Sequence, residues 1–519
     1  MKIETTPILK SGGPSLGTKP RKAVSIRRNT VANYVGTFCQ VLLGFLFVPL
    51  YIKYLGIECY GLIGFSVSLS ALLRLADLGL SSTLGREFAR YSVLPESALR
   101  MRSLLKTLQT VYWAISILVG LMIVAVAPLI AKYWINQGSL DVSVVEKAVV
   151  LMGMTTAMQG PMSLYVGGIF GLQKHVLGNL INSTLAVMRF GGVVLVLALL
   201  SPTITAFFTY QFCVALIGAI GTGIILWGSL PKTDTPSRFQ ISQLRSVWRF
   251  AAGMSINSVL GLILFQLDKI ILIKILPLKM FGYYAVAGTA AVAVTYLGGP
   301  LFTTFLPRYT QLHAAGDDAH LRTSYRDSCR LNAIVTVPTV IILVIFSKEA
   351  LLIWTRNPDI AEHAHLILSL LVIGYGLNQL AYLPYALQIA SGWVKLAVYT
   401  NAAAVLIIVP ALIIAARFYG GVGAASVWIM LNCIYVFIYV NLLHYRILKG
   451  EARNWYIGLL IPSCVAIVGG LLGRQFLFEL TGLWLFAGIC FMWIIVVVAA
   501  ILASSGLREK IQVMLVGYR

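Results

Sequence analysis

The most constraining feature of this sequence is a succession of apolar runs, each close to 20 residues long. A helix of that length spans the roughly 30 Å hydrocarbon core of a membrane. Of the 519 residues, 59% are hydrophobic and only 11% are charged, whereas soluble domains carry about 25% charged residues. The sequence therefore predicts an all-α polytopic membrane protein whose helices cross the bilayer repeatedly.

The hydropathy pattern predicts about fourteen membrane-spanning helices. Their spans are 30–52, 61–83, 107–131, 147–170, 178–200, 205–229, 250–274, 284–307, 331–350, 364–390, 396–416, 422–444, 456–473 and 483–504. Lys and Arg residues gather in the polar stretch over 1–28 and in alternate connections after it. Because cytoplasmic connections are enriched in Lys and Arg, we expect a cytoplasmic basic tail over 1–28 and both chain ends inside.

An internal repeat divides the predicted helices into two halves. The run KYLGIECYG at 53–61 returns in outline as KILPLKMFG at 274–282. Further pairs stand at a similar offset of about 220 residues: Arg86 with Arg308, Arg100 with Arg322, Trp134 with Trp354, and Asn182 with Asn401. Each half holds six helices, so both enter the membrane from the same side and form two pseudo-symmetric lobes around a cavity. The expected boundaries are 29–240 for the first lobe, 241–447 for the second, and 448–519 for two additional helices and a cytoplasmic tail.

Charged side chains inside the predicted spans mark the first candidate site, because ionisable residues at membrane depth usually line a pathway or form an internal pair. Arg74 and Asp77 stand three residues apart and can pair on one helical face. Asp268 and Lys269 are neighbours in the seventh span. For both pairs, a structural role and a cavity role remain open. Arg189 has no acidic residue three or four positions away, so it is expected to meet a distant carboxylate, water or an anionic substrate.

Uncharged polar side chains in the spans mark a second candidate site. The candidates are Gln40, Gln159, Asn257, Asn378, Tyr382 and Tyr385. Gln40 lies in the first helix of the first half and Asn257 in the first helix of the second half, and the last three share one face of the tenth span. Amides and phenols beside a cationic site suit a sugar, through hydrogen bonds and ring stacking. Ordinary polar contacts between helices are the alternative for each of them.

The sequence lacks the motifs that are typical of several other classes of protein. The seven cysteines are scattered without a CxxC pair, so neither a disulfide framework nor a zinc site is predicted. His363 and His365 beside Glu362 make too weak a pattern for a metal site. The sequence has no GxxxxGK[ST] or HExxH, so neither nucleotide hydrolysis nor HExxH-type metalloprotease chemistry is expected. The net charge of +22 lies in short connections rather than in a basic domain, which argues against nucleic acid. No cofactor is predicted.

The beginning of the chain resembles a known family. The run NTVANYVGTFCQVLLGFLFVPLYIKYLGIECYGLIGF, followed by LADLGLSSTLGREFARY, resembles the start of Wzx-type polysaccharide flippases in the multidrug/oligosaccharidyl-lipid/polysaccharide exporter superfamily. The resemblance is strongest over 30–110 and extends through the twelfth span by way of the repeat. Asp77 and Arg86 match its DLG…RE pattern. The resemblance implies a V-shaped pair of six-helix lobes, and the two extra C-terminal helices are similar to those of lipid II flippases.

The resemblance also implies a substrate and a mechanism. Members of this family carry polyprenyl-pyrophosphate-linked oligosaccharides from the cytoplasmic to the outer leaflet, in the bacterial inner membrane, by alternating access. We expect Arg74, Arg189 and Lys269 to neutralise the pyrophosphate, and Asp268 and Asp77 to bind a coupling ion. Membrane lipids, a polysaccharide polymerase and chain-length machinery are the expected partners.

Two other functions stay open from the sequence. One is a multidrug or cation antiporter of the same superfamily, which would need an acidic and apolar cavity rather than cationic charges at membrane depth. The other is a membrane polysaccharide polymerase or glycosyltransferase. Such an enzyme would need a sizeable external loop bearing catalytic residues, and the predicted external connections are short.

Overall fold

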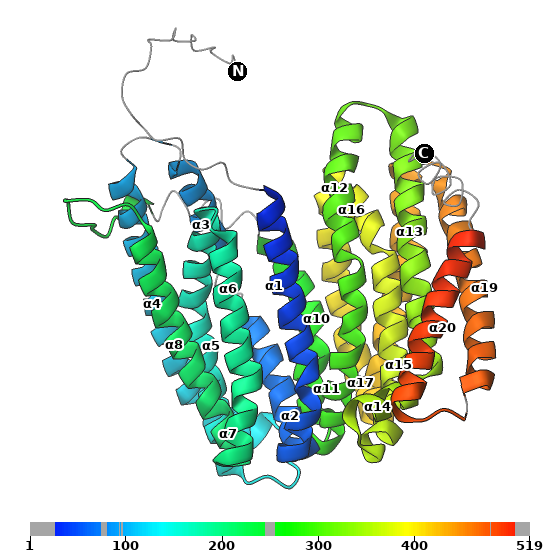
Figure 1. Cartoon of the computed structure of the whole chain (residues 1–519), viewed down its shortest axis with the longest axis horizontal. Helices are drawn as coiled ribbons and strands as arrows, with labels where there is room; N and C mark the ends of the chain where they lie inside the picture. The colour runs from blue at the N-terminus through cyan, green and yellow to red at the C-terminus, as the bar shows by residue number, and fades with distance from the viewer. Residues whose placement is uncertain are drawn as a thin grey trace.

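The computed structural model of this chain describes residues 26–73, 80–92, 94, 97–243, 255–477 and 479–503. Within these residues the regular structure is helical, and no strand is present. The helices form two bundles that stand side by side and diverge toward one end of the molecule (Figure 1). The expected fold class, an all-α membrane protein with two lobes, is therefore confirmed.

The first lobe contains α1 to α8. Its helices are α1 (Ile26–Leu46), α2 (Val48–Leu73), α3 (Leu80–Tyr91), α4 (Ala98–Leu129), η2 (Ile130–Trp134), α5 (Val142–Gly171), α6 (His175–Ala186), η3 (Val187–Gly192), α7 (Val193–Leu199) and α8 (Ile204–Ser229). η2 and η3 are π-helical turns that continue the α-helix before them.

The second lobe contains α10 to α18 and is followed by two further helices. Its helices are α10 (Ser255–Ile275), α11 (Leu278–Ala291), η4 (Val292–Leu297), α12 (Gly299–Ala314), α13 (Asp318–Ile345), α14 (Ser347–Thr355), α15 (Pro358–Leu380), α16 (Tyr382–Ala390), α17 (Val394–Ile434), η5 (Tyr435–Tyr439) and α18 (Val440–Arg446). The terminal pair is α19 (Glu451–Leu477) and α20 (Gly482–Ala503).

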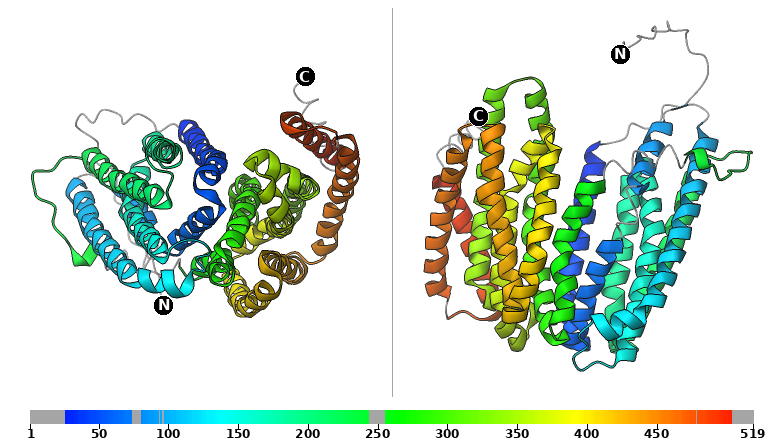
Figure 2. Two further views of the ribbon diagram at one scale, coloured as in Figure 1. Left: turned by 90° about the horizontal axis from the view of Figure 1, so that it is seen from below. Right: turned by 180° about the vertical axis from the view of Figure 1, so that it is seen from behind.

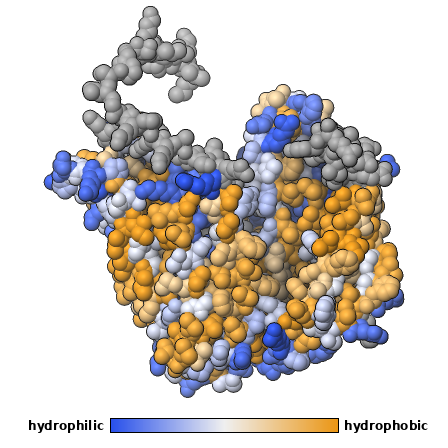
Figure 3. All heavy atoms as spheres, viewed as in Figure 1, coloured by the Kyte–Doolittle hydropathy of each residue, from blue (hydrophilic) through white to orange (hydrophobic). Residues whose placement is uncertain are grey.

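The membrane-facing surface follows from the apolar character of these helices. Among the described residues, ten helical segments are long and apolar enough to cross a bilayer. One of them, Lys395–Arg446, is 52 residues long and contains a break at Gly420, so it accommodates the two predicted spans 396–416 and 422–444. The space-filling view shows an apolar belt between two polar edges (Figure 3). The total of fourteen crossings and the cytoplasmic location of both ends stay predictions.

One residue interrupts the helical conformation at the corresponding position of each repeat. Within α2, only Gly56 departs from helical geometry, with φ 81° and ψ 169°, a region that favours glycine because it has no Cβ. At the corresponding place in the second repeat, Pro277 precedes α11 and has φ −55°. Proline ends the preceding helix because it lacks an N–H and clashes with the turn before it. Both repeats therefore interrupt the helix at the same position, one with a glycine and the other with a proline.

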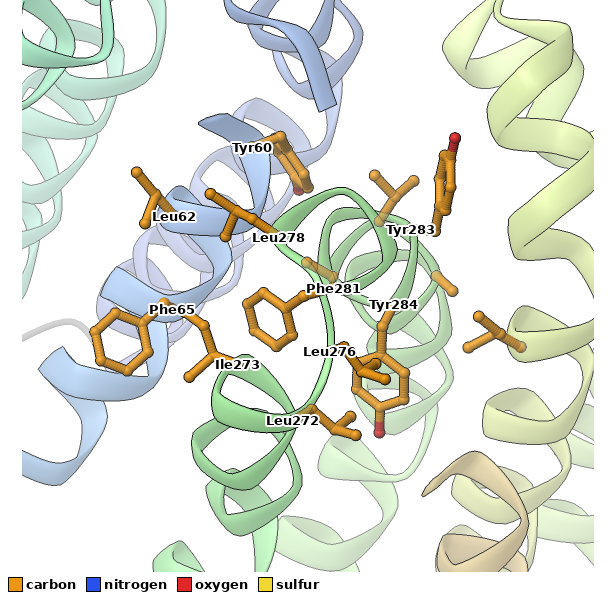
Figure 4. Close-up of a cluster of buried hydrophobic side chains, with 14 of the residues drawn as sticks. Tyr60, Leu62, Phe65, Leu272, Ile273, Leu276, Leu278, Phe281, Tyr283 and Tyr284 are labelled. Carbon is orange, nitrogen blue, oxygen red and sulfur yellow. The ribbon is translucent and has the colours of Figure 1, made fainter. Parts of the chain in front are cut away.

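The lobes meet where α2 crosses α11, and small residues allow the close approach. A Cβ at Gly61 would lie 2.9 Å from the carbonyl oxygen of Leu278, and a Cβ at Gly282 would clash with the carbonyl oxygen of Ile57. These residues form corresponding pairs of the repeat, Ile57 with Leu278 and Gly61 with Gly282. The contact is therefore symmetric, and it supports a duplication whose axis passes through this crossing. Figure 4 shows the apolar side chains of α2, α10 and α11 that surround it.

Two tryptophans that correspond in the repeat reinforce this junction from opposite lobes. The indole N–H of Trp134, at the end of η2, donates to the carbonyl oxygen of Ile270 in α10 at 3.2 Å. The indole N–H of Trp354, at the end of α14, donates to the carbonyl oxygen of Phe45 in α1 at 3.1 Å. Trp354 also stacks on the ring of Phe45, with centroids 4.2 Å apart. Each lobe therefore binds the first helix of the other.

The terminal helices α19 and α20 pack along the outside of the second lobe (Figure 2). At the start of α19, the buried carboxylate of Glu451 accepts from the guanidinium of Arg326 at 2.6 Å and from Arg322 at 3.3 Å. Near its other end, Arg474 donates to the carbonyl oxygen of Ile345 at 2.8 Å. α19 is thus attached to α13 at both of its ends.

Candidate functional site

A chamber of about 1230 Å³ lies between the first half of α1 and the inner face of the second lobe. A hollow between the two lobes is visible on the surface (Figure 3). The described residues that line the chamber come from α1, α10, η4, α12, α15, α16, α17 and η5. The chamber therefore lies on the side of the lobe interface where α1 begins, whereas the crossing of α2 and α11 fills the opposite side.

The lining is aromatic and amide-rich. Its aromatic residues are Tyr34, Phe38, Phe265, Tyr296, Tyr382, Tyr385, Trp428, Tyr435 and Tyr439. Its amides are Asn33, Gln266, Asn378, Gln379 and Asn401. Among the described residues that line it, none carries a formal charge. Such a surface offers flat apolar faces together with donors and acceptors, but no fixed charge.

A π-helical turn and a stacked cluster position the tyrosines of the lining. In η5, Tyr435 donates to the amide oxygen of Asn401 at 2.8 Å, and Tyr439 donates to the amide oxygen of Gln388. On another wall, Tyr382 stacks on Phe302 with centroids 4.6 Å apart. These bonds and stacks fix the rings in place, so the lining is organised before any ligand binds.

Two polar groups of the lining are buried without a hydrogen-bond partner in the structure. One is the amide oxygen Oε1 of Gln379 and the other is the indole N–H of Trp428. The Nε2 group of Gln379 donates to the carbonyl oxygen of Thr295 at 2.5 Å, which fixes the amide orientation. Because a buried polar group without a partner lowers stability, such groups in a cavity often bind a ligand or ordered water.

The predicted sugar-facing residues divide into two groups. Asn378, Tyr382 and Tyr385 line the chamber, and Asn378 also donates to the amide oxygen of Asn432 at 2.9 Å. The other three are absent from its described lining. Gln40 is half-buried on the face of α1 that holds Gly36 and Gly44, which approach α6 and η3.

Gln159 is half-buried in α5 of the first lobe. The backbone of Asn257 belongs to α10, and its side chain lies outside the described part of the structure. The structure therefore does not bring the six candidates together on one surface.

Of the predicted phosphate-binding cations, Arg189 lies in the first lobe on the π-helical turn η3. Its Nε donates to the amide oxygen of Gln211 in α8 at 3.4 Å, and the Gln211 amide donates back to the backbone oxygen of Arg189 at 2.9 Å. A π-helical turn often accompanies a functional site, because the extra residue redirects side chains. Arg189 is not part of the described chamber lining.

Asp268 and Lys269 lie together in α10. The phenol of Tyr284 donates to Oδ2 of Asp268 at 2.6 Å, and the Lys269 ammonium lies 3.9 Å from Oδ1. Lys269 also donates to the amide oxygen of Gln266 at 3.5 Å, and Gln266 lines the chamber. Asp268 thus faces α11, and Lys269 lies one side chain away from the chamber.

The remaining predicted pair, Arg74 and Asp77, lies outside the described residues. Arg86 of the DLG…RE pattern is described and pairs with Glu87 at 2.7 Å.

His363, one of the two histidines of the weak metal pattern, stacks on Tyr283 with ring centroids 5.0 Å apart. Among the residues that the structure describes, no group of three His, Cys, Asp or Glu side chains is placed to bind a metal ion.

Several lining residues were not predicted from the sequence. Tyr435 and Tyr439 stand four positions apart, a spacing that also fits an ordinary packed helix face. Trp428 and Gln379 fall in apolar runs without a recognisable motif. Their roles depend on η5 and on the packing of α15 against α17, and neither feature has a local sequence signal.

Comparisons with known proteins agree with this architecture. A family model described as polysaccharide biosynthesis protein matches residues 26–313, and the MatE model matches residues 253–414. A putative O-antigen transporter of Shigella flexneri is 18% identical over 405 residues, covering 78% of this chain and 94% of that protein.

Solved structures show the same fold. The lipid II flippase MurJ in an inward closed conformation has a TM-score of 0.69 at 14% identity, covering 93% of this chain and 100% of that one. A MATE transporter of Vibrio cholerae has a TM-score of 0.52 at 14% identity, covering 83% of this chain and 99% of that one. Because the polysaccharide model matches more than half of the residues, this chain belongs to the polysaccharide biosynthesis protein family.

Proposed function

We propose that this protein is a flippase that moves polyprenyl-pyrophosphate-linked oligosaccharides from the cytoplasmic to the outer leaflet of the bacterial inner membrane. The observation that carries the proposal is the chamber of about 1230 Å³ with its aromatic and amide lining. The physical task is to carry a large polar headgroup past hydrocarbon while its lipid tail stays in the bilayer. A hydrogen-bonding chamber between two lobes meets that need.

The direction of transport follows from the predicted orientation. If both ends of the chain are cytoplasmic, the side on which α1 begins faces the cytoplasm, and the chamber lies on that side. The junction of α2 and α11 then closes the outer side. Transport would require the lobes to separate at this junction and to approach each other around the chamber, which is alternating access between two lobes.

The pyrophosphate needs cationic partners, and we assign it to Arg74, Arg189 and Lys269. Arginine binds phosphate oxygens with two parallel hydrogen bonds, and lysine acts as a point charge. Lys269 is held beside the chamber wall through Gln266. Arg189 would bind on the first-lobe side. The oligosaccharide would contact Asn378, Tyr382 and Tyr385, and we keep Gln40, Gln159 and Asn257 as contacts for another stage of transport.

Transport against a gradient needs a driving force, and we propose a proton or a sodium ion bound at Asp268, with Asp77 as a second candidate. Oδ1 of Asp268 is buried without a hydrogen-bond partner, and Oδ2 is bonded by Tyr284. Oδ1, which has the Lys269 ammonium 3.9 Å away, is therefore the oxygen at which we propose that the ion binds. A polysaccharide polymerase and chain-length machinery would use the product on the outer side.

The test is reconstitution of the purified chain in liposomes that contain a fluorescent polyprenyl-pyrophosphate-linked oligosaccharide. Flipping is measured as the fraction of label that an external quencher or a glycosidase reaches. The chain is expected to accelerate the exchange between leaflets at least ten-fold over protein-free liposomes. Equal rates with and without the protein would exclude the proposal.

A multidrug antiporter remains the second candidate, because the MatE model matches residues 253–414. A cation antiporter would be expected to bind its cargo with a carboxylate, and the described chamber lining contains none. Efflux of a cationic dye from the same liposomes would favour this function, and flipping without dye efflux would exclude it. A polymerase is separated from both by assaying glycan chain growth.

A further inference from the structure

We infer that the chamber selects oligosaccharides whose enclosed sugars are uncharged and excludes those that carry acidic sugars. This inference rests on the proposed function and specifies its substrate. The sequence places cations at membrane depth, which suggests a uniformly cationic pathway. In the structure, the described cations lie outside the chamber, and the described residues that line the chamber are uncharged.

The first argument is electrostatic. A carboxylate that enters a low-dielectric site loses its hydration, and this loss is severe unless a cation or several donors replace the water. Lys269, which contacts the lining residue Gln266 but does not line the chamber itself, already lies 3.9 Å from the carboxylate of Asp268. Arg189 lies in the first lobe, bonded to Gln211. A uronate among the enclosed sugars would therefore have no matching charge among the described residues that line the chamber.

The second argument concerns the unpartnered polar groups. The indole N–H of Trp428 is a donor without an acceptor, and Oε1 of Gln379 is an acceptor without a donor. A sugar hydroxyl can accept from the first, and another hydroxyl of the same chain can donate to the second. A carboxylate can accept from Trp428, but it cannot donate to Gln379. The pair therefore matches neutral hydroxyls better than acidic groups.

The third argument concerns shape. Tyr435 and Tyr382 are fixed by a hydrogen bond and by a ring stack, respectively. Their rings offer apolar faces to the C–H side of a pyranose, while the hydroxyl of Tyr435 is hydrogen-bonded to Asn401. Recognition of this kind uses ring faces and hydroxyl positions, so it needs no charge on the ligand.

The experiment compares two probes that differ in one group. The first is farnesyl-pyrophosphate linked to a trisaccharide of neutral hexoses. The second carries a hexuronate in place of the central hexose. Dissociation constants are measured by calorimetry on the full chain in nanodiscs. The neutral probe is expected to bind at least ten-fold more tightly. Equal affinities, tighter binding of the uronate probe, or no binding of the neutral probe would overturn the inference.

Variants locate the effect in the chamber. Trp428→Phe retains the ring and removes the N–H, so it should weaken binding of the neutral probe about five-fold. Trp493→Phe is the matched control, because that indole donates to Thr339 near the terminal helices at 2.9 Å. An effect of Trp428→Phe no larger than that of Trp493→Phe would contradict the assignment.

A variant that gains affinity for the uronate probe tests the electrostatic argument without relying on a loss of binding. Thr400 lines the chamber, and Thr400→Lys would introduce a cation there. The variant should bind the uronate probe at least five-fold more tightly than the native chain does, and an unchanged affinity would overturn the inference. Selective binding without any flipping would overturn the proposed function alone. Flipping of both lipid-linked glycans at equal rates would overturn the selectivity alone.

Discussion

At Arg189 one amide binds both the side chain and the backbone of the same residue, since Gln211 accepts from the guanidinium and donates to the carbonyl oxygen. This arrangement fixes the direction of a cation at membrane depth. Arg189→Ala is expected to reduce flipping at least ten-fold while the protein is still produced, because a phosphate group would lose a charge-assisted bond.

Arg189→Lys keeps the charge but loses the fork of donors, so partial activity is expected. The measurement is the amount of surface polysaccharide in a strain that lacks the native gene, together with the amount of protein in the membrane. Normal polysaccharide with Arg189→Ala would remove this residue from the pathway.

Asp268 offers a second residue-scale test, because one of its oxygens is bonded by Tyr284 and the other is not. Asp268→Asn removes the charge with little change in size. Flipping by this variant should no longer respond to an imposed proton or sodium gradient, whereas the native chain should respond several-fold.

Tyr284→Phe is the control, because it removes the hydrogen bond and keeps the carboxylate. This variant is expected to retain the response to the gradient. If Asp268→Asn responds as the native chain does, the ion binds elsewhere.

At the scale of elements, the crossing of α2 and α11 depends on the absence of a side chain at Gly282. A Cβ there would clash with the backbone oxygen of Ile57. Gly282→Val should therefore destabilise the structure by about 1–3 kcal/mol, the usual range for overpacking a tight contact. Gly288 lies on the same helix with no atom within 4 Å of an added Cβ. Gly288→Val is the matched control, and a similar loss of thermal stability in both variants would show that the crossing is not the cause.

The sequence predicted the elements well where hydropathy alone decides the outcome. The predicted spans 456–473 and 483–504 correspond closely to α19 and α20, because each is a continuous apolar run. The break at Gly56 falls in the connection between the predicted spans 30–52 and 61–83. In contrast, span 331–350 begins well after the start of α13 at Asp318, since its first turns are polar and hydropathy cannot detect them.

The chamber was less predictable because its geometry is set by packing between distant segments. Tyr382 and Tyr385 were recognised from their shared helical face. Tyr435 and Tyr439 were not, because the hydrogen-bond shift of a π-helical turn depends on its neighbours rather than on its own sequence. The lack of a hydrogen-bond partner at Oε1 of Gln379 likewise depends on contacts between helices.

At the scale of the whole molecule, the two lobes should open at the α2–α11 crossing during transport. A Cβ at Gly64 would lie 2.7 Å from the Cβ of Ala285, so the two helices must separate by about 1 Å to reach the Cβ–Cβ distance of a disulfide. In a chain whose seven native cysteines are replaced, Gly64→Cys combined with Ala285→Cys should form a cross-link under oxidation. Flipping should then stop, and a reductant should restore it.

Each single cysteine variant serves as the control and should be insensitive to oxidant. The cross-link is measured as a shift in electrophoretic mobility after cleavage of the chain between the two cysteines. A fully cross-linked protein that still flips its substrate would show that this junction does not open during transport.

The attachment of α19 to α13 makes the two halves of the molecule mechanically unequal. Glu451 is bound by two arginines of α13 at one end, and Arg474 is bound to the last turn of α13 at the other. If the second lobe rotates, the terminal helices α19 and α20 should therefore move with it as one rigid body. The first lobe has no such additional helices among its described residues, so it should undergo the larger tilt in the bilayer.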